Sequence, residues 1–115
     1  MPEAELHGVV EGRGADLVIE VAKELDVHEA ERLWDELRDA ISLQQAVTLD
    51  MRDCNFMDST GLTVVIRAAR ELRRRNRSLA VFGLGGQPRR IFELTKVGEN
   101  AGIRVHPLTQ APVTS

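Results

Sequence analysis

Apolar residues recur along this chain with two different periods, and the changes between them outline the secondary structure. Apolar and polar residues alternate over residues 47–51, as in a strand with one buried face. Over residues 30–41 the apolar residues recur at every third or fourth position, which predicts an amphipathic helix of about four turns. A similar stripe over residues 58–76 predicts a second helix.

The rest of the chain continues this alternation of strand and helix. We expect two short strands joined as a hairpin at 8–11 and 17–22, a strand at 79–82, a loop at 83–86, a third helix from 88 to about 96 and a last strand at 103–105. Such alternation favours an α/β sheet with crossover helices. Residues 107–115 lack a period and contain two prolines, so we expect a loosely ordered tail.

The first predicted helix has a recognisable start. Asp26 is followed three residues later by Glu29, which resembles a capping box. In that motif, side-chain oxygens accept hydrogen bonds from the unpaired amides of the first helical turn. The pair therefore predicts that the helix begins at Asp26.

Two hydroxyl residues, Ser59 and Thr60, lie where the strand at 47–51 leads into the second helix. This is the carboxyl end of a sheet strand, where α/β proteins place their functional groups. A helix start favours negative charge, so Ser59 is placed to carry an anion. Gly61 costs the helix about 1 kcal/mol relative to alanine, which indicates a close approach to the backbone. Asp58, Ser59 and Thr60 are equally explained as a simple helix cap.

The composition suits one domain, assigned to residues 1–115 with a core at about 6–105. The chain has 115 residues, 43% of them hydrophobic, and can bury a core. It has no run of about 18 apolar residues, and its first twenty residues are acidic where a signal peptide is basic and then apolar. We therefore expect a cytoplasmic protein without membrane insertion. Cys54 is the only cysteine, which excludes an internal disulfide and a cysteine metal cluster.

Charge is distributed unevenly behind a net charge of -3. Up to Asp58 there are fifteen acidic and five basic residues, whereas from Ser59 onward there are three acidic and ten basic ones. Six arginines crowd the end of the second helix: Arg67, Arg70, Arg73, Arg74, Arg75 and Arg77. Arginines late in a helix oppose its negative dipole end, and a pI of about 5.6 does not suit a dedicated nucleic-acid binder. We expect no direct contact with nucleic acid.

The string FMDSTGL at residues 56–62 follows an alternating strand, and Glu24-Leu25-Asp26 opens the first helix. In this order and spacing the chain resembles, from Leu6 to Val105, the STAS domain of bacterial anti-sigma factor antagonists. These proteins are also called anti-anti-sigma factors. The resemblance implies a single STAS-like α/β domain, with a small mixed β-sheet and helices packed on one side. Family members usually end with a further helix, which the tail of this chain does not predict.

The resemblance also implies a phosphorylation switch. The family's phosphorylated serine falls on Ser59, with Thr60 as the competing acceptor, and its kinase is the partner anti-sigma factor. The unphosphorylated protein binds that partner and frees the sigma factor, and the phosphorylated protein releases it. Expected partner contacts are Asp26, Asp58, Ser59, Thr60 and Gly61, and a homodimer is a further expected assembly. Because the kinase supplies the catalytic groups, the chain is expected to be no enzyme, without catalytic residues, metal or cofactor.

Other functions agree less well with the residues. A serine hydrolase would need G-x-S-x-G and a histidine base, and no histidine motif accompanies Ser59. A receiver domain would need an acidic pair after its first strand, which is missing. The glycines at 83–86 have no lysine in P-loop spacing. A regulatory or scaffold role in a lipid-transport or stress-signalling complex stays open, with Ser59 or Thr60 as a contact.

Overall fold

The computed structural model describes residues 17–43 and 46–106. Its elements in chain order are β1 (Leu17–Glu20), β2 (Glu24–Leu25), α1 (Val27–Ser42), β3 (Val47–Asp50), β4 (Phe56–Met57), α2 (Ser59–Arg74), β5 (Leu79–Phe82), α3 (Gly86–Thr95), α4 (Val97–Asn100) and β6 (Arg104–His106). The predicted helices and later strands are confirmed to within a few residues. The expected strand at 8–11 and the expected loose tail lie outside the described residues.

Four strands form the main sheet in the order β1-β3-β5-β6, and every described pair is parallel. Leu49 of β3 lies between Ile19 of β1 and Val81 of β5. Parallel neighbours require a crossover connection, which α1, α2 and the pair α3 and α4 supply in turn. The strand that would make the sheet mixed is the first strand of the expected hairpin, and it falls outside the described residues.

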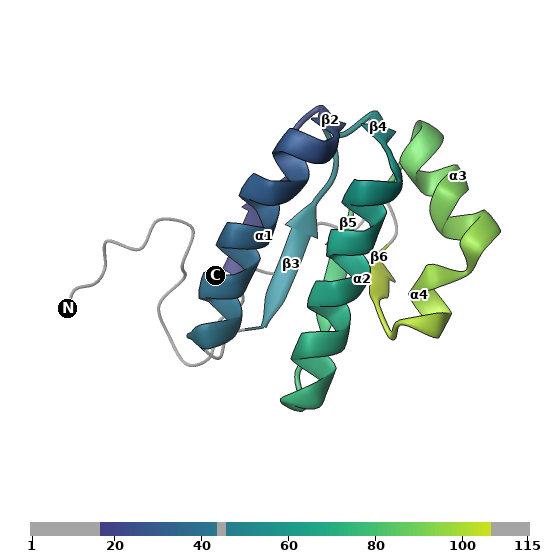
Figure 1. Cartoon of the computed structure of the whole chain (residues 1–115). Coiled ribbons are helices and arrows are strands. Elements are labelled where there is room, and N and C mark those ends of the chain that lie inside the picture. Colours follow the sequence, from purple (N-terminus) through teal and green to yellow (C-terminus); the bar gives the residue numbers. More distant parts are fainter. Residues whose placement is uncertain (1–16, 44–45, 107–115) are drawn as a thin grey trace.

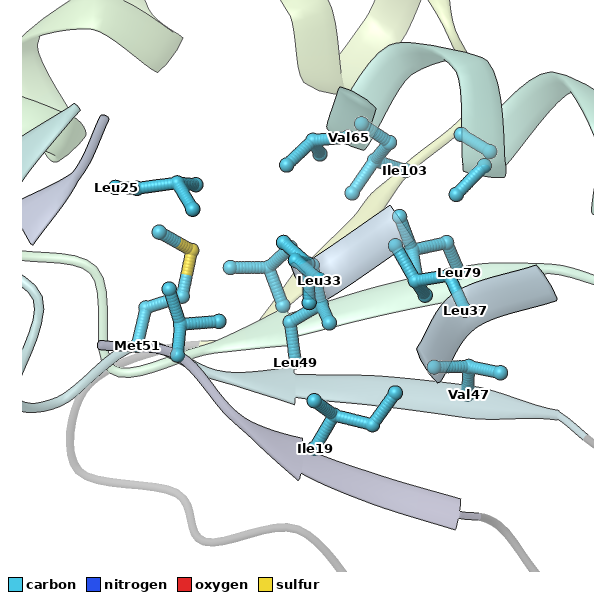
Figure 2. Packing of buried hydrophobic residues seen from close by; sticks show 14 of the residues in the cluster. Ile19, Leu25, Leu33, Leu37, Val47, Leu49, Met51, Val65, Leu79 and Ile103 are labelled. Atoms are coloured by element: carbon cyan, nitrogen blue, oxygen red, sulfur yellow. The ribbon is translucent and has the colours of Figure 1, made fainter. Parts of the chain in front are cut away.

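Helices α1 and α2 lie side by side over one face of the sheet, and α3 and α4 lie beyond α2 near β6 (Figure 1). The hydrophobic core fills the space between this helical layer and the sheet. Figure 2 shows Ile19 and Leu49 of the strands beside Leu33 and Leu37 of α1. The apolar residues of the alternation over 47–51 do belong to this core, but the prediction of a single buried face is wrong, because Thr48 and Asp50 are buried as well.

Strands β2 and β4 were not anticipated. Glu24 and Leu25 were expected to open the first helix, but they form β2, and only Asp26 caps α1. β2 pairs in parallel with β4 as a separate two-stranded sheet. Two residues are too few to show a strand period, so these strands follow from their pairing and not from a sequence pattern.

Two further boundaries differ from expectation. α3 begins at Gly86, so the loop predicted at 83–86 is one residue shorter, and Pro88 occupies the first turn as predicted. After α3, Lys96 adopts a left-handed backbone with φ of 54°, and the short helix α4 follows directly. The sequence does not announce this helix end, because glycine or asparagine is the usual residue in a left-handed C-terminal cap and lysine is not.

Candidate functional site at the start of helix α2

The start of α2 is held by Asp58. This residue has an extended backbone, with φ of -100° and ψ of -176°, and its side chain caps the helix. The amide of Gly61 donates a hydrogen bond of 2.9 Å to Oδ1 of Asp58, and the amide of Leu62 donates one of 3.0 Å to its carbonyl oxygen. This is the N-cap geometry that the sequence predicted for these residue types.

Ser59 and Thr60 are the first two residues of α2, and both are exposed. Thr63, one turn later, donates its hydroxyl to the carbonyl oxygen of Ser59 over 2.8 Å. No hydrogen bond among the described residues takes up the hydroxyl of Ser59. Its side chain is therefore accessible at the positive end of a helix of 16 residues.

The start of α1 lies next to the start of α2. Leu25 of β2 pairs with Met57 of β4, and the amide of Asp58 donates to the carbonyl oxygen of Leu25 over 3.3 Å. The residues that follow, Asp26 and Asp58, each cap one helix at the same edge. Three of the predicted contact residues, Asp26, Asp58 and Ser59, are thus brought together, although the first two are distant in sequence.

Gly61 is buried, and its close neighbour belongs to the chain itself. A Cβ atom at this position would lie 2.6 Å from Cγ and 2.7 Å from the carbonyl oxygen of Leu25. The close approach that the early glycine predicted is therefore present, as packing of α2 on β2. Of the predicted contact residues, Gly61 is the one that lies inside the molecule.

Gln87 is a further residue of the site that sequence reasoning missed. Its side-chain amide donates to the carbonyl oxygen of Met57 over 2.9 Å, and its Oε1 accepts from the Met57 amide over 2.8 Å. The side chain thus completes the open edge of β4 as a third strand would. It ties the first turn of α3 to the segment that carries Asp58 and Ser59. No local motif announces this role, because the two residues are thirty positions apart.

Two apolar side chains flank the two helix starts. Val27, the first residue of α1, is 48% exposed, and Phe56 of β4 is 43% exposed. Such residues are usually buried in a small domain. They leave apolar area exposed on the segments around the two helix starts, as a protein contact would use.

Charged and reactive groups near the site have structural partners. Asp50, at the end of β3, is buried, and Arg52 donates to both of its carboxylate oxygens over 3.0 and 2.7 Å. This bidentate hydrogen bonding from Arg52 lowers the pKa of Asp50, against the opposing effect of burial. Burial raises the pKa of the Cys54 thiol, so this cysteine is not an activated nucleophile. Over residues 17–43 and 46–106, no group of three His, Cys, Asp or Glu side chains is placed to hold a metal ion.

Comparison with known proteins identifies the fold and the family. A family model described as the STAS domain matches residues 7–107. The chain belongs to the STAS domain family. An anti-sigma-B factor antagonist of Listeria monocytogenes serovar 1/2a is 34% identical to this STAS domain over 81 residues, which cover 69% of this chain and 70% of the relative.

Solved structures agree with this assignment. The anti-sigma factor antagonist SpoIIAA in its unphosphorylated form has a TM-score of 0.67 and 22% sequence identity, with 86% of each chain covered. The Bacillus cell fate determinant SpoIIAA in its phosphorylated form has a TM-score of 0.65 and 22% identity, covering 85% of this chain and 89% of that one. At this level of identity the likeness shows a shared fold.

The described part of this STAS domain contains no helix that is both long and apolar enough to cross a bilayer. Its arginines on α2 are exposed. Arg67 stacks on the ring of Trp34 in α1 at 4.1 Å, and Arg74 pairs with Glu71 over 2.8 Å. These contacts give two of the six clustered arginines a structural partner.

Proposed function

We propose that this STAS domain is a cytoplasmic anti-sigma factor antagonist controlled by phosphorylation of Ser59. With Ser59 bare, it binds an anti-sigma factor that is a serine kinase and so frees a sigma factor for transcription. With Ser59 phosphorylated, it releases that partner. The observation that carries the proposal is the exposed hydroxyl of Ser59 on the first residue of α2. The similarity to a Listeria anti-sigma-B factor antagonist supports the class of partner.

The start of α2 can accept the added charge without loss of the fold. A helix start favours an anion by about 0.3 to 1 kcal/mol through its dipole. The first turn of α2 contains no acidic side chain, so the capping Asp58 is the carboxylate that this helix start already holds. Asp58 takes up the amide of Gly61, and no described hydrogen bond uses the amides of Ser59 or Thr60. Phosphorylation therefore changes the surface more than the stability.

The same geometry explains why phosphorylation would release a partner. A phosphoryl group adds a charge of about -1.5 to -2 at pH 7. Here that charge would lie next to Asp58 at the edge where Asp26 and Asp58 cap the two helices, on a surface that also exposes Val27 and Phe56. A partner surface that covers apolar area and a neutral hydroxyl cannot desolvate this charge without new cationic groups. Binding should therefore be weakened strongly.

In this proposal the chain is the substrate of the phosphoryl transfer and not its catalyst. The kinase supplies ATP, magnesium ligands and the groups that bind the phosphates. Thr60 is the competing acceptor, because it is also exposed and is only about 100° further around the helix. The assignment to Ser59 rests on the family motif and on its place as the first residue of α2.

The test begins with a pull-down from the source cell to recover an ATP-binding anti-sigma factor. We expect this kinase and ATP to place one phosphate on Ser59, located by mass spectrometry of the modified peptide. Ser59→Ala should remain unmodified and still bind the partner, and Thr60→Ala should still be modified. Ser59→Asp should fold and bind at least about tenfold more weakly, which corresponds to about 1.4 kcal/mol.

Ser42→Asp provides a matched control. Ser42 is exposed at the last residue of α1, so the same charge is added at the opposite end of the helical layer. This variant should bind the partner as the unmodified protein does. Phosphate on Thr60, or full binding by Ser59→Asp, would contradict the assignment to Ser59. Recovery of transporter subunits in place of a kinase would support the alternative regulatory role.

A further inference from the structure

The outer surface of the α1–α2 layer is formed by two parallel helices with a common starting level. Leu25 pairs with Met57, and each helix begins two residues after its paired residue. Each helix has 16 residues. Equal positions in α1 and α2 therefore lie at nearly equal heights along the layer, and no other described element covers the two helices in Figure 1.

The two helices present opposite charge on this surface, here called the α1–α2 face. The exposed charged residues of α1 are mainly acidic: Glu31, Asp35, Glu36 and Asp39, with Arg32 and Arg38. The exposed charged residues of α2 are all arginines: Arg67, Arg70, Arg73 and Arg74. The chain thus carries a mainly acidic and a basic strip side by side on one layer, within which Asp35 pairs with Arg38 over 3.1 Å and Glu71 with Arg74 over 2.8 Å. A two-fold rotation brings the acidic strip of one copy onto the basic strip of a second copy, so the surface is complementary to itself in charge.

A two-fold axis parallel to the helices places α1 of one copy on α2 of the other at the same height. After this rotation, acidic residues of α1 lie at the same height as arginines of the partner's α2. Asp35 is the ninth residue of α1, and Arg67 is the ninth residue of α2. Asp39 is the thirteenth of α1 and Arg70 the twelfth of α2, a difference of about 1.5 Å in height. Residues three or four positions apart share one helix face, so both pairs form together.

We infer that a second copy of this chain docks on the α1–α2 face through this two-fold axis. Asp35 then faces the partner's Arg67, and Asp39 faces the partner's Arg70, with each contact made twice by symmetry. Trp34, half-buried with Arg67 stacked on it at 4.1 Å, lies between the two strips. Tryptophan and arginine are the residue types enriched at the centres of protein interfaces.

The dimer should be weak and sensitive to salt. Two helices of 16 residues are each about 24 Å long and 10 Å wide, so the face is smaller than the roughly 800 Å² per partner of a standard interface. Exposed charges at such a face mainly select the partner and its orientation. Raising the salt concentration from about 50 mM to about 500 mM screens the attraction between these charges and should shift the equilibrium toward monomer.

The experiment uses purified full-length protein in sedimentation velocity at increasing concentration. Asp39→Arg and Arg70→Glu each reverse one charge of an opposed pair, and neither residue belongs to an ion pair within the described ranges. Each variant alone should raise the dissociation constant at least about tenfold, since like charges then meet twice. Glu99→Arg and Arg90→Glu make the same charge changes at exposed positions on α4 and α3 and should leave the dissociation constant unchanged.

The decisive measurement mixes the two reversed variants. A heterodimer of Asp39→Arg with Arg70→Glu has opposite charges at both contacts, so the mixture should dimerise as the unmodified protein does. Urea unfolding first confirms that both variants fold. A protein that stays monomeric in low salt, a dimer indifferent to both reversals, or a mixture without restoration would each overturn the inference. No kinase is involved, so failure here would leave the proposed Ser59 switch unaffected.

Discussion

The starts of helices α1 and α2 share one backbone design but carry different side chains. Each follows a two-residue strand, and each is capped by an aspartate with an extended backbone. The caps accept from the amide three residues later over 3.0 Å at Asp26 and 2.9 Å at Asp58. The backbone solution is therefore the same, so any difference in function must come from the residues that follow the cap.

Those residues differ in charge and in hydroxyl groups. After Asp26 come Val27, His28 and Glu29, so the first turn of α1 already contains a carboxylate. After Asp58 come two hydroxyl residues and Gly61, and the first turn of α2 contains no acidic side chain. The positive end of α1 is thus balanced from within, whereas that of α2 is open to an added group. This contrast supports the proposal that the start of α2, and not that of α1, is the one that is phosphorylated.

The two helix starts should differ most in how much a substitution at the third helical position lowers the free energy of unfolding. This position is Gly61 in α2 and Glu29 in α1. Gly61→Ala should lower the free energy of unfolding by about 2 kcal/mol, because its Cβ would overlap the carbonyl oxygen of Leu25 and overpacking outweighs the gain in helix propensity. Glu29→Ala, at the equivalent position, should cost less than about 1 kcal/mol. Urea unfolding measures both. Equal effects would show that the close approach of α2 to β2 imposes no constraint.

The two caps should behave alike. Asp26→Ala and Asp58→Ala should each cost about 1 kcal/mol, because each leaves one first-turn amide without its acceptor. The corresponding asparagine variants should recover most of this loss, since asparagine caps as well as aspartate does. The measurement is again the urea midpoint. A loss at Asp58 several times that at Asp26 would show that the two starts are not equivalent.

Strands β1 and β3, which precede the starts of α1 and α2 in the chain, each end in an acidic residue, but the two carboxylates have different surroundings. Glu20 of β1 lies opposite Asp50 of β3, but only Asp50 is buried and bound to Arg52. The pKa of Asp50 is lowered in the folded protein, so this contribution to stability is present above the unfolded value of about 3.9 and is lost as pH falls through the folded value.

Arg52→Gln should therefore destabilise the protein at pH 7, and the loss should be smaller than that of a helix cap. The deficit should shrink as pH is lowered below about 3.9. Urea unfolding at pH 7 and pH 3 measures the change. Arg90→Gln, at an exposed position of α3, serves as the control and should show no such pH dependence. A deficit that stays constant with pH would show that Arg52 acts by packing on Phe82, whose ring lies 5.1 Å away.

The smallest expected effects concern Ser59 itself. Ser59→Ala should change the free energy of unfolding by less than about 0.5 kcal/mol, because Thr63 still has the backbone carbonyl as its acceptor. Ser59→Asp should raise stability by a few tenths of a kcal/mol, up to about 1, through the helix dipole. Val27→Asp should gain less, since Glu29 is already present in that turn. A larger gain at Val27 would contradict the contrast between the two helix starts.

Much of this comparison could be predicted from sequence, because local patterns determine it. The capping role of Asp26 and Asp58 and the stripes of α1 and α2 all follow from residues within one or two turns of each other. The placement of Ser59 at a helix start was likewise predicted, although the strand directly before it is β4 and not the predicted strand over 47–51. The proximity of the two starts was not, because it depends on pairing between β2 and β4.

The sequence by itself determined the strands of the four-stranded sheet, the main helices, the caps of α1 and α2 and the family, since each depends on short-range patterns or on the contiguous FMDSTGL motif at residues 56–62. Tertiary structure alone decided that Gly61 packs on Leu25 and that Gln87 completes the edge of β4. Both contacts join segments about thirty or more positions apart, and neither segment carries a local signal of its partner. They form once the helices pack on the sheet, because buried backbone groups then need hydrogen-bond partners. Apolar surface is also removed from water in the same step.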